Sequence, residues 1–279
     1  MLEKIKYINH MMEEMTWGES GIFVNYNDLR DFSWAYTSAN NRISSFYKGI
    51  VKKTVPLIIY CENEEEGYKK RNELFEICEK DVVAMKHGKI VIGDYYLKCY
   101  VTGSSKTNYL ESKGYMEAAL EVTTDFPSWV KETTTSFRGI SEDEGFGTVD
   151  GKNFDFNYDF PFDYSNEFND KRLKNSGFVG TAFKMIIYGS CTNPKISINE
   201  HIYQVNVELS DNEYLTIDSM TKTIVLTKYN GEKENCFHLR SRESYIFEPI
   251  PPGENLITWN GGFGFDVILL DERSEPKWI

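Results

Sequence analysis

Short runs of alternating apolar residues fill the last third of the chain. The apolar pairs spaced two positions apart are Ile196 with Ile198, Leu215 with Ile217, and Ile224 with Leu226. A period of two residues is typical of a strand with one buried face. Turn-forming pairs separate these runs, namely Asp211-Asn212, Asn230-Gly231 and Pro252-Gly253. Short strands separated by such turns predict an antiparallel β-sandwich.

Four more strand-like runs come early in the chain, at residues 22–26, 31–36, 43–51 and 54–61. Phe32, Trp34 and Tyr36 in the second run share one face, because side chains alternate across a strand. Pro56 has no backbone N–H to donate. It therefore predicts that the fourth run lies at a sheet edge or that a strand begins there.

One segment has the pattern of a helix. Asn63 is a suitable N-cap, and the three glutamates that follow it favour the positive end of a helix. Leu74, Ile77 and Cys78 then form an apolar stripe. We expect the helix to end near Lys80 and to cover one face of a β-sheet.

The rest of the chain suggests two domains. Strand patterns recur at residues 88–92, 94–101, 116–122 and 182–188, whereas residues 133–175 are rich in Gly, Asp, Asn and Ser. Such a stretch is typical of a connection, although aromatic residues at every second position from Phe154 to Phe162 indicate a strand within it. The sequence predicts a mainly β protein. A β-rich domain with one helix would occupy residues 1–135, a connecting segment 136–175, and an antiparallel sandwich 176–279.

Charge and cysteine content narrow the classes of function. The 279 residues include 31 Lys and Arg against 43 Asp and Glu, a net charge of −12. This balance argues against binding a nucleic-acid backbone, which requires a basic surface. No apolar run approaches the length of a membrane span, and the N-terminus lacks the apolar core of a signal peptide. The five scattered cysteines fit buried free thiols made in a reducing cytoplasm.

The candidate metal and phosphate sites are weak. Asp155, Asn157 and Asp159 have the spacing that opens a calcium loop, but Phe160 stands where the loop needs Gly. Cys236 and His238 would share a strand face, yet no second Cys/His pair follows at zinc-finger spacing. The glycines at 261, 262 and 264 are followed by a strand pattern, so they favour a turn over a phosphate loop. We therefore expect no metal ion, no cofactor and no catalytic residue.

Exposed aromatic residues are the remaining candidates for a function. Trp259 comes at a strand end, where its ring could stack on a sugar or a partner protein, or could instead fill the sandwich core. Trp34, Tyr36, Phe46 and Tyr47 are more large aromatics than one thin sheet face readily buries. These four are candidates for an interface between subunits.

The chain also resembles a known family in several stretches that lie in order along it. They are residues 23–49 (FVNYNDLRDFSWAYTSANNRISSFYKG), 94–106 (DYYLKCYVTGSSK), 125–132 (DFPSWVKE), 213–226 (EYLTIDSMTKTIVL), 250–259 (IPPGENLITW) and 272–278 (ERSEPKW). Together they resemble the distal tail proteins of long-tailed bacteriophages, which also occur in prophages and phage-derived particles. The resemblance covers nearly the whole chain.

This resemblance implies a structural protein of the virion tail that is assembled in the cytoplasm of the bacterial host. The N-terminal domain would form a ring, usually of six copies, around the tail channel. A galectin-like C-terminal domain would face the tail-tip or receptor-binding proteins. Two alternatives remain from the residues alone: a carbohydrate-binding sandwich, and a cell-wall hydrolase built on a pair of carboxylates.

Overall fold

The computed structural model describes residues 4–19, 21–110, 115–139 and 172–278. The chain divides into two compact units. The first contains residues 1–131 and 272–279, and the second contains residues 132–271. Residues 272–279 thus belong with the first unit, whereas the sequence predicts a second domain over residues 176–279. No helix among the described residues is both long and apolar enough to span a membrane.

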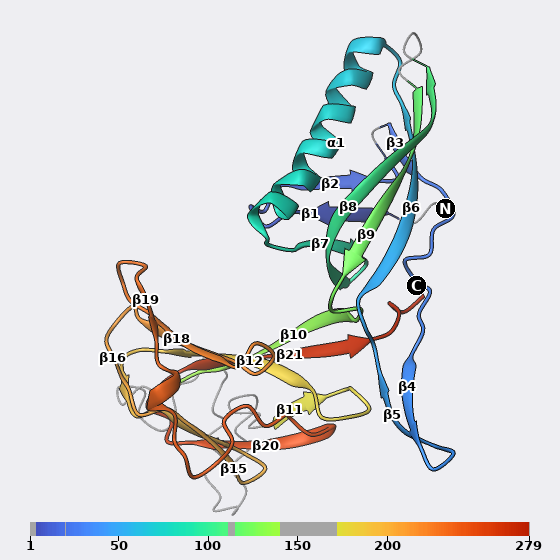
Figure 1. Cartoon of the computed structure of the whole chain (residues 1–279). Coiled ribbons are helices and arrows are strands. Elements are labelled where there is room, and N and C mark those ends of the chain that lie inside the picture. Colours follow the sequence, from blue (N-terminus) through green and yellow to red (C-terminus); the bar gives the residue numbers. More distant parts are fainter. Residues whose placement is uncertain (1–3, 20, 111–114, 140–171, 279) are drawn as a thin grey trace, which may run out of the picture. The chain divides into compact units, whose positions relative to one another are not determined.

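The first unit is built on antiparallel strands (Figure 1). They are β1 (Ile5–Ile8), β2 (Glu14–Trp17), β3 (Ile22–Val24), β6 (Val51–Tyr60), β7 (Gly88–Ile92), β8 (Tyr95–Leu110) and β9 (Tyr115–Thr124). The first part of β8 pairs with β7, and its longer second part pairs with β9. From β7 the ladder continues to β1 and β2, and from β9 it continues to β6 and β3. The long strand β8 therefore joins the two ladders.

Helix α1 (Glu64–Ala84) contacts β6 and β8 of this unit (Figure 1). Asn63 caps it as predicted, because its side-chain oxygen accepts a hydrogen bond from the Glu66 N–H at 2.8 Å. The predicted stripe of Leu74, Ile77 and Cys78 is buried. The helix continues beyond Lys80, since it ends where Met85 adopts a left-handed conformation with φ of 53°. That conformation depends on the backbone around the position, which side-chain periodicity does not report.

The prediction for Pro56 was wrong. Strand β6 begins at Val51, and Pro56 pairs with Ala119 of β9 in the middle of the strand. On the other side, β3 ends at Val24 opposite Leu57. The next residue, Asn25, donates its N–H to the Pro56 carbonyl at 2.9 Å. Pro56 is tolerated because it lies where the β3 ladder ends and no neighbouring strand needs its missing N–H.

The second unit is a sandwich of antiparallel strands, as the alternating pattern predicted (Figure 1). One sheet has the order β19-β18-β17-β12-β21-β10, and the other has the order β11-β20-β14-β15. The first contains most of β10 (Trp129–Phe137) and of β21 (Phe265–Arg273), together with β12 (Ala182–Tyr188), β17 (Tyr214–Asp218), β18 (Thr223–Thr227) and β19 (Lys233–Asn235). The second contains β11 (Arg172–Asn175), β14 (Lys195–Ile198), β15 (His201–Gln204) and β20 (Gly253–Trp259). Two short pieces, β13 (Cys191–Thr192) and β16 (Glu208–Leu209), pair with each other.

Both sheets of this sandwich contribute side chains to one core between them. The alternating residues Ile196, Ile198, Leu215, Ile217 and Ile224 are all buried in it. The first unit has a separate core around Trp17, Leu57 and Trp129. The prediction of a mainly β fold is confirmed.

Candidate assembly interface

The most exposed secondary structure of the first unit is a hairpin of β4 (Ala35–Ala39) and β5 (Arg42–Tyr47). Every residue of both strands is exposed, and the hairpin extends away from the other strands of the unit (Figure 1). Asn40 and Asn41 form its tip with φ of 51° and 59°. Two successive positive φ values are those of the tight turn that suits a twisted hairpin, and Asn accepts them readily.

The four aromatic residues proposed from the sequence all lie on or beside this hairpin. Their exposed fractions are 50% for Trp34, 60% for Tyr36, 59% for Phe46 and 52% for Tyr47. Tyr36 lies directly opposite Phe46 in the ladder, and Tyr47 lies opposite Ala35. Adjacent residues of a strand point to opposite faces, so Phe46 and Tyr47 place one large ring on each face. The hairpin therefore has apolar surface on both sides and no core of its own.

The base of the hairpin is fixed to the first unit by two lysines. Lys48 Nζ donates to the Pro127 carbonyl and to Ser128 Oγ, at 3.2 and 3.3 Å, and lies 4.5 Å from the centre of the Trp34 ring. Lys53 is buried and donates to the carbonyls of Asp28 and Asp31. Burial lowers the pKa of both amines. Fixed ends and exposed strands make the hairpin an arm on a rigid base.

Trp259, the other candidate, is engaged within the second unit. Its Nε1–H donates to the Phe263 carbonyl at 3.0 Å. Its ring packs edge-on against Phe265 and Phe137, with centroid distances of 5.3 and 6.0 Å. The ring lies partly buried against the sandwich core. Trp259 therefore packs within the sandwich, which favours a structural role over stacking on a sugar or a partner protein.

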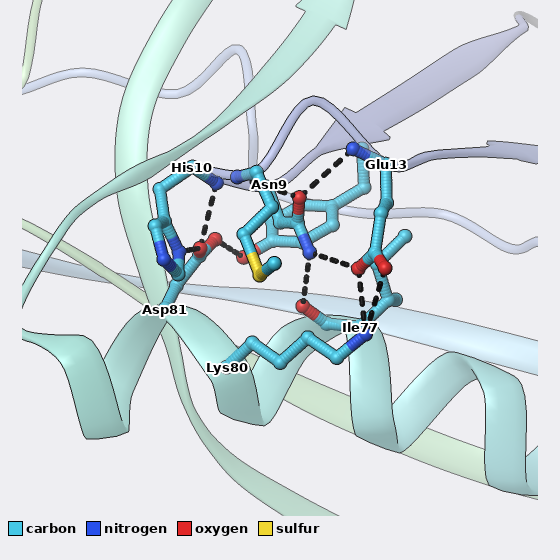
Figure 2. A network of polar contacts seen from close by, with 8 residues as sticks. Asn9, His10, Glu13, Ile77, Lys80 and Asp81 are labelled. Atoms are coloured by element: carbon cyan, nitrogen blue, oxygen red, sulfur yellow. Dashed lines mark hydrogen bonds and ion pairs between the residues drawn. The ribbon is translucent and has the colours of Figure 1, made fainter.

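A buried polar network joins helix α1 to the turn between β1 and β2 (Figure 2). Asp81 is fully buried and accepts hydrogen bonds from the Tyr7 hydroxyl at 2.6 Å and the His10 N–H at 2.8 Å. His10 Nδ1 lies 2.6 Å from the same carboxylate. Gly88 allows this approach, because a Cβ there would lie 2.2 Å from Asp81 Oδ2. Sequence reasoning missed the network because His10 and Asp81 are 71 positions apart.

A second part of the network fixes the turn itself (Figure 2). The side-chain oxygen of Asn9 accepts hydrogen bonds from the N–H groups of Met11 and Glu13, and its amide donates to the Glu13 carboxylate at 2.6 Å. Lys80 on the helix also binds Glu13 at 2.8 Å, and this contact is the main reason why the Glu13 pKa is lowered. The turn is thereby held against the helix.

A hollow of about 470 Å³ lies beside this network, between the β1–β2 turn, the end of α1 and the start of β7. His10, Met12, Met85, Lys86, His87 and Lys89 contribute to its lining. Met12 and Met85 both have positive φ values, 66° and 53°, and their side chains are 78% and 81% exposed. The hollow thus combines basic side chains with two exposed methionines.

The candidate metal and phosphate motifs do not form sites in the described part of the chain. Cys236 and His238 do not share a strand face, because they flank and occupy a short 3-10 turn, η2 (Phe237–Leu239). The glycines at 261, 262 and 264 are followed directly by strand β21 and not by a helix, as expected for a turn. Asp155, Asn157 and Asp159 lie outside the described residues. Within the described ranges, no group of three or more His, Cys, Asp or Glu side chains could hold a metal ion.

Comparison with known proteins gives a result only for structures. No protein-family model and no curated protein matches the chain. The crystal structure of the SPP1 Dit protein, described as a paradigm of the hub adsorption apparatus in phages that infect Gram-positive bacteria, matches with a TM-score of 0.59. That match covers 98% of this chain and 100% of that one at 10% identity. This chain has the fold of a phage hub protein.

Two structures of the phage P2 baseplate in its activated conformation, with Ca and with Sr, match equally well. Their TM-scores are 0.62 and 0.60, and each match covers 99% of this chain and 100% of the matched chain at 13% identity. The fold is therefore shared over the full length with proteins of two phage particles, although few residues are identical. The predicted resemblance to distal tail proteins is confirmed at the level of fold.

Proposed function

We propose that this chain is a structural protein of a phage tail that forms a ring-shaped hub at the distal end of the tail. The ring would join the tail tube to the tip or receptor-binding proteins. The observation that carries this proposal is the exposed β4–β5 hairpin, on a chain that shares its fold over its full length with a phage hub protein. The chain would act by assembly and would not be an enzyme.

The hairpin supports a contact between copies for an energetic reason. A two-stranded hairpin is marginally stable alone in water, and this one exposes large rings on both faces. Packing the rings of Tyr36 and Phe46 against a neighbouring copy would remove apolar surface from water, which is the main driving force of association. In a head-to-tail contact of this kind, every copy has both of its contact surfaces occupied only when the copies close into a ring.

The remaining details come from the family resemblance. The first unit would surround the channel, the usual copy number would be six, and the second unit would face outward toward the tip proteins. The two units would fold as separate domains. The protein would be made and assembled in the cytoplasm of the bacterial host and would end in the virion tail.

The experiment that tests this proposal is imaging of the particle that contains the protein. Gold-labelled antibody against the second unit should mark the distal end of the tail in negative-stain micrographs. Averaged images should show annular density at the same level. Label along the tail shaft or on the head, or a distal end without annular density, would contradict the hub.

A further inference from the structure

The basic hollow, defined above by His10, Met12, Met85, Lys86, His87 and Lys89, has two lysines in its lining, and Lys89 Nζ lies 4.5 Å from the centre of the Tyr96 ring. Within the described residues, neither Lys86 nor Lys89 forms an ion pair. Five other lysines of the same unit do, because Lys4, Lys6, Lys52, Lys80 and Lys131 each contact a carboxylate. The hollow thus places two lysines that have no carboxylate partner among the described residues beside two exposed methionines.

The opposite end of helix α1 has the complementary character. Glu62, Glu64, Glu65 and Glu66 are all exposed there, and none of them forms an ion pair with a described residue. Tyr60 and Tyr68 lie beside them with exposed fractions of 56% and 38%. The Tyr68 hydroxyl donates to Glu64 at 2.8 Å. We call this surface the acidic end.

The two surfaces cannot meet within one chain. Helix α1 has 21 residues, and a rise of about 1.5 Å per residue separates its ends by about 30 Å. The helix dipole favours acids at the first end and bases at the other, which accounts for the signs of the charges. It does not account for exposed apolar side chains at both ends. Tyrosine and methionine are enriched in interfaces between proteins, and the rim around such an apolar centre is polar.

We propose that the basic hollow of one copy receives the acidic end of helix α1 of a second copy. Lys86 and Lys89 would pair with the glutamates, while Met12 and Met85 would pack against Tyr60 and Tyr68. Methionine suits this role because its flexible side chain adapts to the shape of a partner. The contact joins two different surfaces and so repeats from copy to copy, as a ring requires. This inference rests on the proposed ring and names a second contact within it, besides the hairpin.

Charge reversal of each surface gives the test. One variant carries Lys86→Glu and Lys89→Glu, and the other carries Glu62→Lys, Glu64→Lys and Glu65→Lys. Sedimentation velocity across a concentration series would measure self-association of the full chain. Each variant alone should need at least about tenfold more protein than the wild type to associate, because like charges would then face each other.

Mixing the two variants separates this contact from a general effect of charge. Every hollow in the mixture then has a partner of opposite sign on the other variant, so the equimolar mixture should recover association. The control matched to the lysine variant is Lys195→Glu with Lys233→Glu, which changes the net charge of the chain by the same amount as that variant, at exposed positions of the second unit. This control should associate as the wild type does, and circular dichroism should show helix α1 intact in all variants.

Three results would overturn the inference. They are a wild-type chain that stays monomeric at every concentration, single variants that associate as the wild type does, and a mixture that fails to recover. None of them decides whether the protein lies at the tail tip, which imaging of the particle tests separately. The lysine variant could associate normally and still be absent from particles. That result would show that the hollow binds an acidic surface of another tail protein.

Discussion

The Tyr7 hydroxyl donates a 2.6 Å hydrogen bond to the fully buried carboxylate of Asp81. Tyr7 belongs to β1 and Asp81 to the last turn of α1, so this contact joins residues 74 positions apart. Tyr7 is itself fully buried and stacks on Trp17 with a centroid distance of 5.7 Å. A buried polar group is costly unless hydrogen bonds satisfy it, so this contact stabilises the attachment of the helix to the sheet.

Tyr7→Phe should destabilise the first unit by about 1–3 kcal/mol. The substitution keeps the ring and its stacking on Trp17 but removes one of the hydrogen bonds that Asp81 accepts. Urea denaturation followed by circular dichroism at 222 nm would measure the loss. Tyr26→Phe is the matched control, because Tyr26 is 85% exposed and should change stability by less than about 0.5 kcal/mol. Equal stability of both variants would show that Asp81 does not depend on the hydroxyl.

The same contact predicts a loss of stability at alkaline pH. Burial, followed by the hydrogen bond to Asp81, raises the pKa of Tyr7 far above its ordinary value of 10.0. Above pH 10 the unfolded chain loses the phenolic proton while the folded chain keeps it, so the free energy of unfolding falls as pH rises. Urea midpoints measured from pH 8 to pH 11 should decrease above pH 10. The decrease should be smaller, but still present, in Tyr7→Phe, since burial also raises the pKa of Tyr203 and of Cys78, the latter to about 12.

The cysteines should differ in reactivity in the native protein. All five are free, and Cys191 is the only one of them that is not buried. Burial raises the pKa of Cys78 to about 12 and also that of Cys99, whereas that of half-buried Cys191 is raised to about 11. Iodoacetamide at pH 8 should therefore modify Cys191 first and slowly, and the other four only after unfolding. Peptide mass spectrometry would read out the order, and early modification of Cys78 would contradict the packing of α1 on its sheet.

The proposed division into two domains predicts where a protease cuts first. Limited proteolysis should cleave between about Phe137 and Asn153 and leave two resistant fragments. The fragment that contains the first unit should be less stable than the intact chain. Residues 272–279 belong with that unit, and Arg30 binds the Pro276 carbonyl at 2.7 Å and the Trp278 ring at 3.9 Å. First cuts within residues 90–125 or 200–230 would contradict the division.

Local patterns were sufficient for most of the secondary structure and insufficient for the surfaces that we assign to assembly. The alternation from Met116 to Val122 became β9, and Asn63 capped α1, because each depends on neighbouring residues alone. The position of Pro56 depended on where β3 ends, which no local pattern contains. The basic hollow combines residues near position 10 with residues near position 87. The return of residues 272–279 to the first unit likewise depends on contacts across most of the chain.

The hairpin makes the most direct prediction about assembly. Tyr36→Ser combined with Phe46→Ser removes the opposed pair of rings from an arm whose residues are all exposed, so the fold of the monomer should not change. Association of the full chain should fall by at least about tenfold, since burying a large aromatic side chain contributes about 1.5–3 kcal/mol. Sedimentation velocity would measure association, and thermal unfolding followed by circular dichroism would check the fold.

The matched control for this prediction is Tyr229→Ser combined with Tyr245→Ser in the second unit. These tyrosines are 79% and 54% exposed, so the control removes comparable aromatic surface from a different place. If the ring forms through the hairpin, the control should associate as the wild type does while the hairpin variant remains monomeric at the same concentration. A hairpin variant that associates normally would show that the arm does not contact a second copy. The ring would then need another interface, and the basic hollow is the one that the first unit offers.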